Sequence, residues 1–233
     1  MALANVGIVV TQFGQHELTL NCLQSLQAHH DLEAVRILVV DDASPAAHSR
    51  RGLQRLDIPF EILALPKNCG ITVAWNAAAQ VLLDRHTPAS LIFLNNDVVT
   101  EGNWIPQLVA PLGDENMRCT GVRWREERVA STHELNLPTT RFLEGWCMAV
   151  DSDTFTLLGG FDQHMQLYFS DTDLQARLLQ EFRSTENCPL AVVENLPVRH
   201  LEHQTTKTSL NRISLWQRDR QTFIHKWRRV PPT

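Results

Sequence analysis

The chain has 233 residues, of which 43% are hydrophobic and 20% are charged, and its formal net charge at pH 7 is -5. It is long enough for one large domain, or for a domain with an appendage, around a substantial core. This ordinary globular composition excludes a disordered chain, and no apolar run approaches the ~20 residues that a membrane-spanning helix needs.

Four short runs rich in Val, Ile and Leu predict strands that are covered on both faces. They are VGIVVTQF (6–13), VRILVVDD (35–42), FEILAL (60–65) and SLIFLNND (90–97). The helical spacing of Leu20, Leu23 and Leu26 predicts a helix over 17–29, and the Ala-rich segment 71–85 predicts a second one. The alternation predicts an α/β fold with a mostly parallel central sheet flanked by helices.

Polar side chains follow each predicted strand at the point where it ends. They are Thr11 and Gln12, then Asp41, Asp42 and Ser44, then Asn68 and Gly70, and finally Asn95, Asn96 and Asp97. Ligands of such sheets bind beyond the carboxyl ends of the strands, so we expect these residues to line a site. Each also has a structural interpretation as a cap or turn residue. Neither a glycine-rich dinucleotide turn nor a Walker loop is present, which favours a ligand held by carboxylates and a metal.

The segment YFSDTDLQARLLQ contains two acids with different expected roles. Asp171 and Asp173 are two residues apart, so on a helix they point to nearly opposite sides. Ser170 and Asp173 approximate a capping box, which would occupy Asp173 with the helix N-terminus. Asp171 would then be free to face a cleft.

Five segments in a fixed order give the sequence a specific resemblance. VVTQF, VVDDAS, KNCGITVAWNAA, FLNNDVV and GWCMAVDSDTFTLLGGFDQHMQLYFSDTDLQARL together resemble the family 2 glycosyltransferases with the GT-A (Rossmann-like) fold, particularly bacterial rhamnosyltransferase-like members. The resemblance implies inverting transfer of a sugar from a UDP- or dTDP-sugar to a glycan or lipid-linked acceptor, with Mg²⁺ or Mn²⁺. It also implies a GT-A domain over 1–205, with a nucleotide-binding half of about 1–100 and an acceptor half of about 101–205.

The resemblance assigns a metal site to the end of the fourth strand. Asp97 matches the metal-binding carboxylate, and a divalent ion there would offset the charge that develops on the departing pyrophosphate. Asn95 replaces an acid usual in the family, and we expect Asn95 and Asn96 to contact sugar or phosphate. The run PLAVVENLPV (189–198) predicts a further strand. In several family members a His after this strand completes the metal site; His200 matches it, with His203 as the alternative. A strand-ending turn is the other interpretation of this motif.

Donor-binding residues also follow from the resemblance. Asp42 matches a base-contacting acid with Asp41 as its partner, and Thr11 matches a contact on the base side. Carboxylates can accept hydrogen bonds from an imide nitrogen or from ribose hydroxyls. Further donor contacts are assigned to the loop and helix start at Asn68, Gly70 and Asn76.

For catalysis, Asp171 matches the general base, which takes the proton of the acceptor hydroxyl as the anomeric carbon is attacked. Ser170 stands where the family has a Glu, and Asp173 is expected to be structural. Trp146 either stacks on an acceptor sugar or belongs to the core. The stretch 124–138 matches no motif, and we expect it to carry acceptor specificity. The loop 204–209 is expected to order over the bound donor.

The C-terminal segment 206–233 is predicted to be a basic helix or tail, since Lys207 to Arg229 holds seven basic residues against one acid, Asp219. It is either a solvated helix or a surface for anionic lipid headgroups or a phosphate-bearing acceptor. No nucleic-acid partner is expected. The cysteines are odd in number and unpaired in spacing, which predicts reduced thiols and a cytoplasmic chain, with the inner face of the membrane as a further option.

Two other function classes remain open. The departures at Asn95 and Ser170 are compatible with a glycosyltransferase-like module that binds a partner without catalysis. A sugar nucleotidyltransferase would share the sheet and the metal. That class usually has a glycine-rich, basic phosphate loop near the N-terminus, and TQFGQHE lacks both features.

Overall fold

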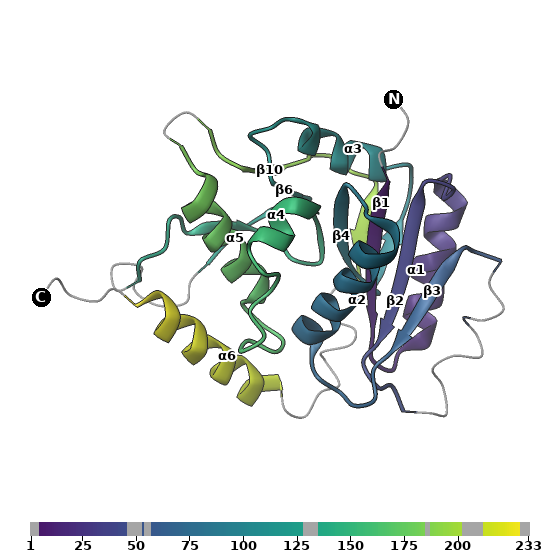
Figure 1. Ribbon diagram of the computed structural model, residues 1–233. Coiled ribbons are helices and arrows are strands. Elements are labelled where there is room, and N and C mark those ends of the chain that lie inside the picture. Colours follow the sequence, from purple (N-terminus) through teal and green to yellow (C-terminus); the bar gives the residue numbers. More distant parts are fainter. Residues whose placement is uncertain are drawn as a thin grey trace, which may run out of the picture.

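The computed structural model describes residues 5–45, 53, 57–127, 135–184, 187–201 and 212–228. Its central element is a seven-stranded sheet (Figure 1). The strands of this sheet are β1 (Val6–Gln12), β2 (Val35–Asp41), β3 (Phe60–Ala64), β4 (Ser90–Asn95), β6 (Cys119–Gly121), β9 (Cys147–Asp151) and β10 (Leu190–Val192). Their order across the sheet is β10-β6-β9-β4-β1-β2-β3.

The sheet is mostly parallel, as the sequence predicted. β1 lies between β4 and β2 and pairs in parallel with both, and β2 pairs in parallel with β3. β9 is antiparallel to both β4 and β6. β1, β2 and β4 are almost entirely buried, because their continuous apolar runs are covered on both faces.

Helices cover both faces of the sheet (Figure 1). They are α1 (His16–His29), α2 (Ile71–His86), α3 (Ile105–Val109), which continues into a 3-10 turn (Ala110–Gly113), α4 (Ser152–Leu157), α5 (Ser170–Phe182) and α6 (Arg212–Trp227). α1 and α3 share one hydrophobic core with one side of the sheet. α2, α4, α5 and α6 share the other core. Among the residues described, we find no helix with the length and apolar character that crossing a bilayer requires.

Two strand pairs lie outside the main sheet. β5 (Val98–Thr100) pairs with β11 (Val198–His200), and β7 (Trp124–Glu126) pairs with β8 (Arg141–Leu143). The prediction of one strand over 189–198 is therefore wrong. The segment breaks between β10 and β11, where Asn195 has a left-handed φ of 58° and Pro197 cannot donate to a ladder.

The predicted C-terminal helix is present as α6 and is docked on the body of the protein. Phe223 and Trp227 are buried in the core that α2 and α5 share. Asp219 is fully buried, and its carboxylate accepts hydrogen bonds from the amides of Leu167, at 2.8 Å, and Tyr168, at 3.0 Å. One face of α6 therefore holds the segment that leads into α5.

All five cysteines are free, as predicted. Cys22, Cys119 and Cys147 are buried, and burial raises the pKa of the Cys22 thiol to about 12. These thiols stay protonated and belong to the core.

Candidate functional site

The carboxyl ends of β1, β2 and β4 meet at one edge of the sheet and bring the predicted polar residues together. Thr11 lies beside Asn95 in the pairing of β1 with β4, and Gln12 lies beside Asp41 in the pairing of β1 with β2. The hydroxyl of Thr11 is buried and has no hydrogen-bond partner within the described part of the chain. A buried, unsatisfied hydroxyl at this edge is a group that a ligand can satisfy.

Asp42 holds the turn that begins α2. Its two carboxylate oxygens accept the amides of Cys69, at 2.7 Å, and Gly70, at 2.9 Å, while the Asn68 side chain donates to the Asp42 carbonyl at 3.2 Å. Burial raises the pKa of Asp42, and the two amide hydrogen bonds oppose this effect. Asp42, Asn68 and Gly70, three predicted donor-binding residues, thus form one contiguous structure.

Asp41 organises the loop after β2. Its Oδ1 accepts the amide of Ser44 at 2.9 Å, and the Ser44 hydroxyl in turn accepts the amide of Gly14 at 2.7 Å. The loops that follow β1 and β2 are therefore tied together beside the site. The nucleotide contact of Asp41 stays a prediction.

Two predicted donor-binding amides are engaged within the protein. Asn76 donates to the Phe161 carbonyl at 2.8 Å and accepts the Phe161 amide at 2.9 Å. Asn96 is buried and donates to the hydroxyl of Thr19 at 3.0 Å. These contacts give both side chains a structural role, and their donor contacts stay predictions without geometric support.

The two predicted metal ligands lie together although 103 residues separate them. The Nε2 atom of His200 lies 2.9 Å from Oδ1 of Asp97, and both side chains are largely buried. The pairing of β5 with β11 brings them into contact, because Val98 lies opposite His200. His203 and the loop 204–209 lie outside the described residues.

This pair fits a divalent cation in part. A carboxylate and an imidazole are ordinary ligands of Mn²⁺, and Mg²⁺ in nucleotide sites is commonly held by one or two carboxylates together with phosphate oxygens. Within the described residues no group of three or more His, Cys, Asp or Glu side chains is placed to hold a metal. Asp97 and His200 would therefore hold the ion together with the phosphates of a donor.

Trp146 stacks on His200, with ring centroids 4.9 Å apart and planes inclined by 10°. Its indole nitrogen donates to Glu144 at 2.7 Å, and the same carboxylate oxygen accepts Nε of Arg123 at 2.9 Å. The face of Trp146 that meets His200 orients the imidazole. Stacking of an acceptor sugar on Trp146 stays a prediction, and it would use the ring surface that His200 does not cover.

Asp171 lies in the first turn of α5, where the helix dipole favours a carboxylate. It was expected to be free to face a cleft, but one of its oxygens is paired within the protein, since Oδ2 lies 3.4 Å from a guanidinium nitrogen of Arg125. Gly145 packs directly on it, since a Cβ at Gly145 would lie 2.6 Å from the same oxygen. Arg125 also donates to the hydroxyl of Thr172 at 2.8 Å. The neighbouring carboxylates, that of Asp171 foremost, raise the pKa of Arg125.

Asp173 is structural, as expected, but the predicted capping box is wrong. The residue that caps α5 is Phe169, with a left-handed φ of 66°, and no side chain caps the helix. Asp173 is fully buried and pairs instead with Arg177 and Lys226, each at 2.8 Å. Trp227 adds a hydrogen bond to Asp173 at 3.0 Å. The acid therefore holds α6 rather than the end of its own helix.

Sequence reasoning did not identify Arg125, Glu144 and Gly145 as site residues. Arg125 lies in the stretch 124–138 that matched no motif, of which residues 128–134 lie outside the described part. Gly145 immediately precedes Trp146, within a segment that the sequence had singled out. The available signal was a glycine next to an aromatic residue, which marks a close approach of backbone to another group.

Comparisons with known proteins bear on the family and the fold of the chain. Residues 8–173 match the family model described as "Glycosyl transferase family 2". No curated protein sequence matches the chain. Among solved structures, the mannosyltransferase PcManGT from Pyrobaculum calidifontis, in complex with GDP-Man and Mn²⁺, superposes with a TM-score of 0.66 at 14% identity, over 98% of this chain and 66% of that one.

Two further structures share the fold. Glucosyl-3-phosphoglycerate synthase from Mycobacterium tuberculosis, in complex with Mn²⁺, UDP and glucosyl-3-phosphoglycerate, gives a TM-score of 0.67 at 14% identity over 97% of this chain and 81% of that one. GalNAc-T7, with UDP, GalNAc and Mn²⁺, gives a TM-score of 0.59 at 16% identity over 75% of this chain and 40% of that one. The chain thus spans slightly less than two thirds of the mannosyltransferase and under half of GalNAc-T7.

At these identities the structural likeness establishes the fold, and it confirms the predicted GT-A architecture. The family follows from the sequence model, which covers well over half of the 233 residues. The chain belongs to glycosyl transferase family 2.

Proposed function

We propose that this chain is an inverting, metal-dependent glycosyltransferase that uses a UDP- or dTDP-sugar as donor and a glycan or lipid-linked molecule as acceptor. A rhamnosyltransferase-like specificity, a role in polysaccharide or glycoconjugate assembly and a cytoplasmic location belong to the same proposal. Complexes of the structural neighbours with nucleotides, a nucleotide sugar and Mn²⁺ support it.

One observation carries the proposal. The dipeptide Gly145–Trp146 touches both halves of the expected chemistry: Gly145 packs on Asp171, and Trp146 stacks on His200, which pairs with Asp97. Three residues from distant parts of the sequence thereby lie around one short segment. A base and a metal-binding pair in such proximity suit the transfer of a group away from a diphosphate.

Each residue of the site has a distinct task in this mechanism. Oδ2 of Asp171 lies beside Arg125, while its Oδ1 accepts no hydrogen bond from the described residues. Oδ1 is therefore placed to accept the proton of the acceptor hydroxyl as that oxygen attacks the anomeric carbon. Asp42 and Thr11 would hold the nucleoside at the other end of the edge.

A divalent ion held by Asp97 and His200 would supply positive charge next to the diphosphate of the departing nucleotide. The protein contributes the orientation of this pair, since the flat contact with Trp146 fixes the imidazole plane of His200. The proposed metal ligand His200 and the proposed base Asp171 are therefore both positioned by the dipeptide Gly145–Trp146.

The direct test is a thermal-shift panel of UDP-, dTDP- and GDP-sugars, each with Mn²⁺ and with a chelator. A ligand that binds only the folded state at about 100 times its Kd stabilises it by about 2.7 kcal/mol, which is readily measured. We expect one nucleotide class to stabilise the chain, and the effect to vanish with chelator and in Asp97→Ala. An effect that survives both conditions would exclude the metal role of Asp97.

Turnover is then followed with the donor that the panel identifies. Asp171→Asn should abolish transfer and leave donor binding nearly intact, and equal loss of both would refute its assignment as base. If the unchanged protein binds the donor without turnover, the non-catalytic module is favoured. The observation that supports this alternative is the Arg125–Asp171 ion pair, because it occupies one oxygen of the proposed base. Release of free pyrophosphate would favour a nucleotidyltransferase.

A further inference from the structure

One flank of α6 is apolar and exposed although the opposite face of the helix is anchored in the core. Ile213 is 73% exposed and Trp216 is 42% exposed, so they are among the four exposed large hydrophobic residues of the described chain. The guanidinium of Arg220 lies over the Trp216 ring, 5.7 Å from its centroid. Spacings of three and four residues place Ile213, Trp216 and Arg220 along one stripe of the helix, which we call the α6 stripe.

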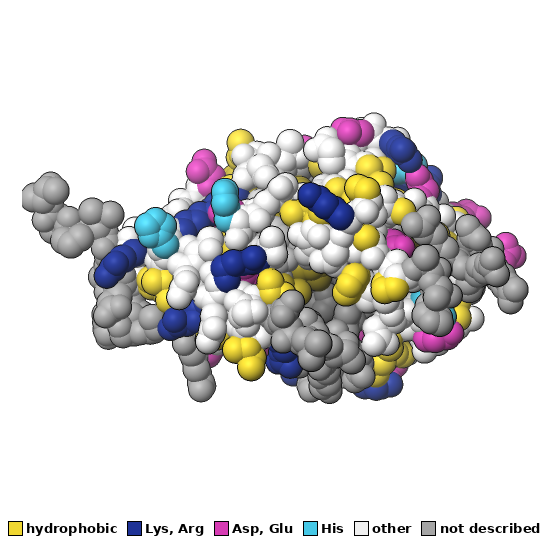
Figure 2. Space-filling model, turned by 90° about the horizontal axis from the view of Figure 1, so that it is seen from below, with side chains coloured by type: hydrophobic (Ala, Val, Ile, Leu, Met, Phe, Trp, Pro, Cys, Tyr) yellow, Lys and Arg dark blue, Asp and Glu magenta, His cyan; other side chains and the backbone are white. Residues whose placement is uncertain are grey.

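The charged side chains of α6 itself are mostly basic, although Lys226 pairs with Asp162 and Asp173, and Arg218 lies 3.4 Å from Asp219. The only acid in α6 is Asp219, and it is fully buried. The basic residues of the helix and of the position that follows it are Arg212, Arg218, Arg220, Lys226 and Arg228. In Figure 2, Lys and Arg side chains gather on the half of the molecule that holds α6, and hydrophobic side chains lie among them.

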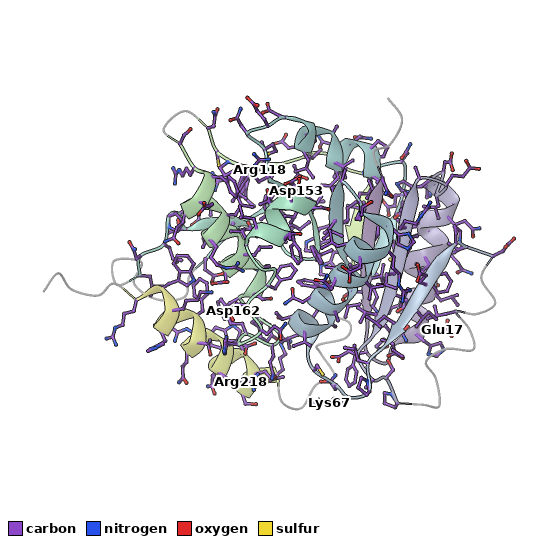
Figure 3. The ribbon with its side chains drawn as sticks, viewed as in Figure 1. Glu17, Lys67, Arg118, Asp153, Asp162 and Arg218 are labelled. Atoms are coloured by element: carbon purple, nitrogen blue, oxygen red, sulfur yellow. The ribbon has the colours of Figure 1, made fainter. Side chains whose placement is uncertain are left out.

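The helix lies along the same edge of the protein as the loop that follows β3, which leads to the predicted donor-binding residue Asn68. In Figure 3, Arg218 of α6 and Lys67, which follows β3, both lie at the lower edge of the molecule. The buried face of α6 is also joined to the site, because Asp219 holds the amides of Leu167 and Tyr168 just before α5, the helix that carries Asp171. A surface bound at α6 would thus have a fixed position relative to the base.

We propose that the α6 stripe docks on an anionic lipid surface. Trp and Ile side chains enter the boundary between headgroups and acyl chains, and Arg side chains pair with lipid phosphates while their stems stay in the apolar layer. An anionic bilayer complements this helix, because its arginines reach the surface and its own acid, Asp219, is buried. The lipid binding stands on these observations alone; the consequence that a lipid-linked acceptor is delivered to Asp171 rests on the proposed function.

The test is sedimentation of the whole chain with vesicles of phosphatidylcholine alone, or with about one third phosphatidylglycerol. We expect at least about tenfold tighter binding to the anionic vesicles, weakening as salt rises. Ile213→Ser should weaken that binding by about tenfold, because an exposed apolar side chain no longer enters the boundary. Arg220→Gln should weaken it by about fivefold.

Leu157→Ser is the matched control, because Leu157 is 66% exposed but belongs to α4. Thermal midpoints confirm that each variant remains folded. Binding to neither vesicle, equal binding to both, or an equal loss in the Leu157 and Ile213 variants would each overturn the inference. Vesicle binding in a chain that no nucleotide sugar stabilises would keep this inference and reject the proposed function.

Discussion

Gly145 is the position at which the smallest possible change tests the proposed base. A Cβ added there would lie 2.6 Å from Oδ2, 2.8 Å from Cβ and 2.9 Å from Cγ of Asp171. Ordinary van der Waals contact begins at 3.4 Å, so Asp171 would have to retreat by about 0.5 to 0.8 Å. The side chain cannot escape by rotation alone, since its own Cβ is one of the contacts.

The size of the effect follows from this displacement. Inserting a methyl group into a packed site costs about 1–3 kcal/mol of the free energy of unfolding. A misplacement approaching 1 Å can lower turnover by about a hundredfold, so we expect a fall in kcat of about ten- to a hundredfold in Gly145→Ala. Nucleotide binding should change little, because Asp42 and Thr11 lie at the end of the sheet edge assigned to the nucleoside.

The assay combines urea unfolding with turnover of the donor found in the thermal-shift panel. Gly113→Ala is the control, because a Cβ at Gly113 meets no atom within 4 Å. It should change the free energy of unfolding by no more than about 0.5 kcal/mol. A Gly145→Ala variant with the stability and turnover of the Gly113 variant would refute the placement of Asp171 against Gly145.

Asp173→Ala should cost about 3–5 kcal/mol in urea unfolding, because it removes a fully buried carboxylate that Arg177, Lys226 and Trp227 all contact; a loss below about 1 kcal/mol would contradict this buried network. Burial raises the pKa of Asp162, but hydrogen bonds led by that of Lys226 outweigh it and hold the pKa at about 2. This carboxylate therefore stabilises the fold above its unfolded pKa near 4 and loses that contribution as the pH falls through 2. Lys226→Gln should flatten the acid limb of a stability–pH curve, and an unchanged limb would speak against this pairing. Asn76→Ala should cost about 2–3 kcal/mol and leave donor affinity unchanged, since both its bonds go to Phe161; the reverse result would restore its donor role.

The elements of the sheet could be predicted closely because their signal is local. The predicted strand over 6–13 is observed as Val6–Gln12, and the predicted helix over 71–85 as Ile71–His86. Continuous apolar runs and helical spacing are properties of neighbouring residues, so they can be recognised along the chain. The break at Pro197 was also visible in the sequence, but the apolar residues on both sides of it outweighed the proline.

The contacts of the site could be predicted only in part. The pairing of Asp97 with His200 was expected from the order of motifs, and the structure places the two side chains together. The Arg125–Asp171 pair could not be predicted, because a contact over 46 residues leaves no local pattern. Asp173 is structural as expected, but its partners were predicted wrongly for the same reason: those on α6 are more than 50 residues away, whereas the capping box is a local motif.

A continuous series of contacts runs from the nucleotide side of the protein to its last helix. Asp42 holds Gly70, the backbone of Gly70 lies against Gln166, and the residues after Gln166 donate to Asp219. Residue 205, the predicted end of the glycosyltransferase domain, is therefore a poor place to shorten the chain for expression. A protein cut there would lack the acceptor of two backbone amides and would expose Phe169, the cap of the helix that carries Asp171.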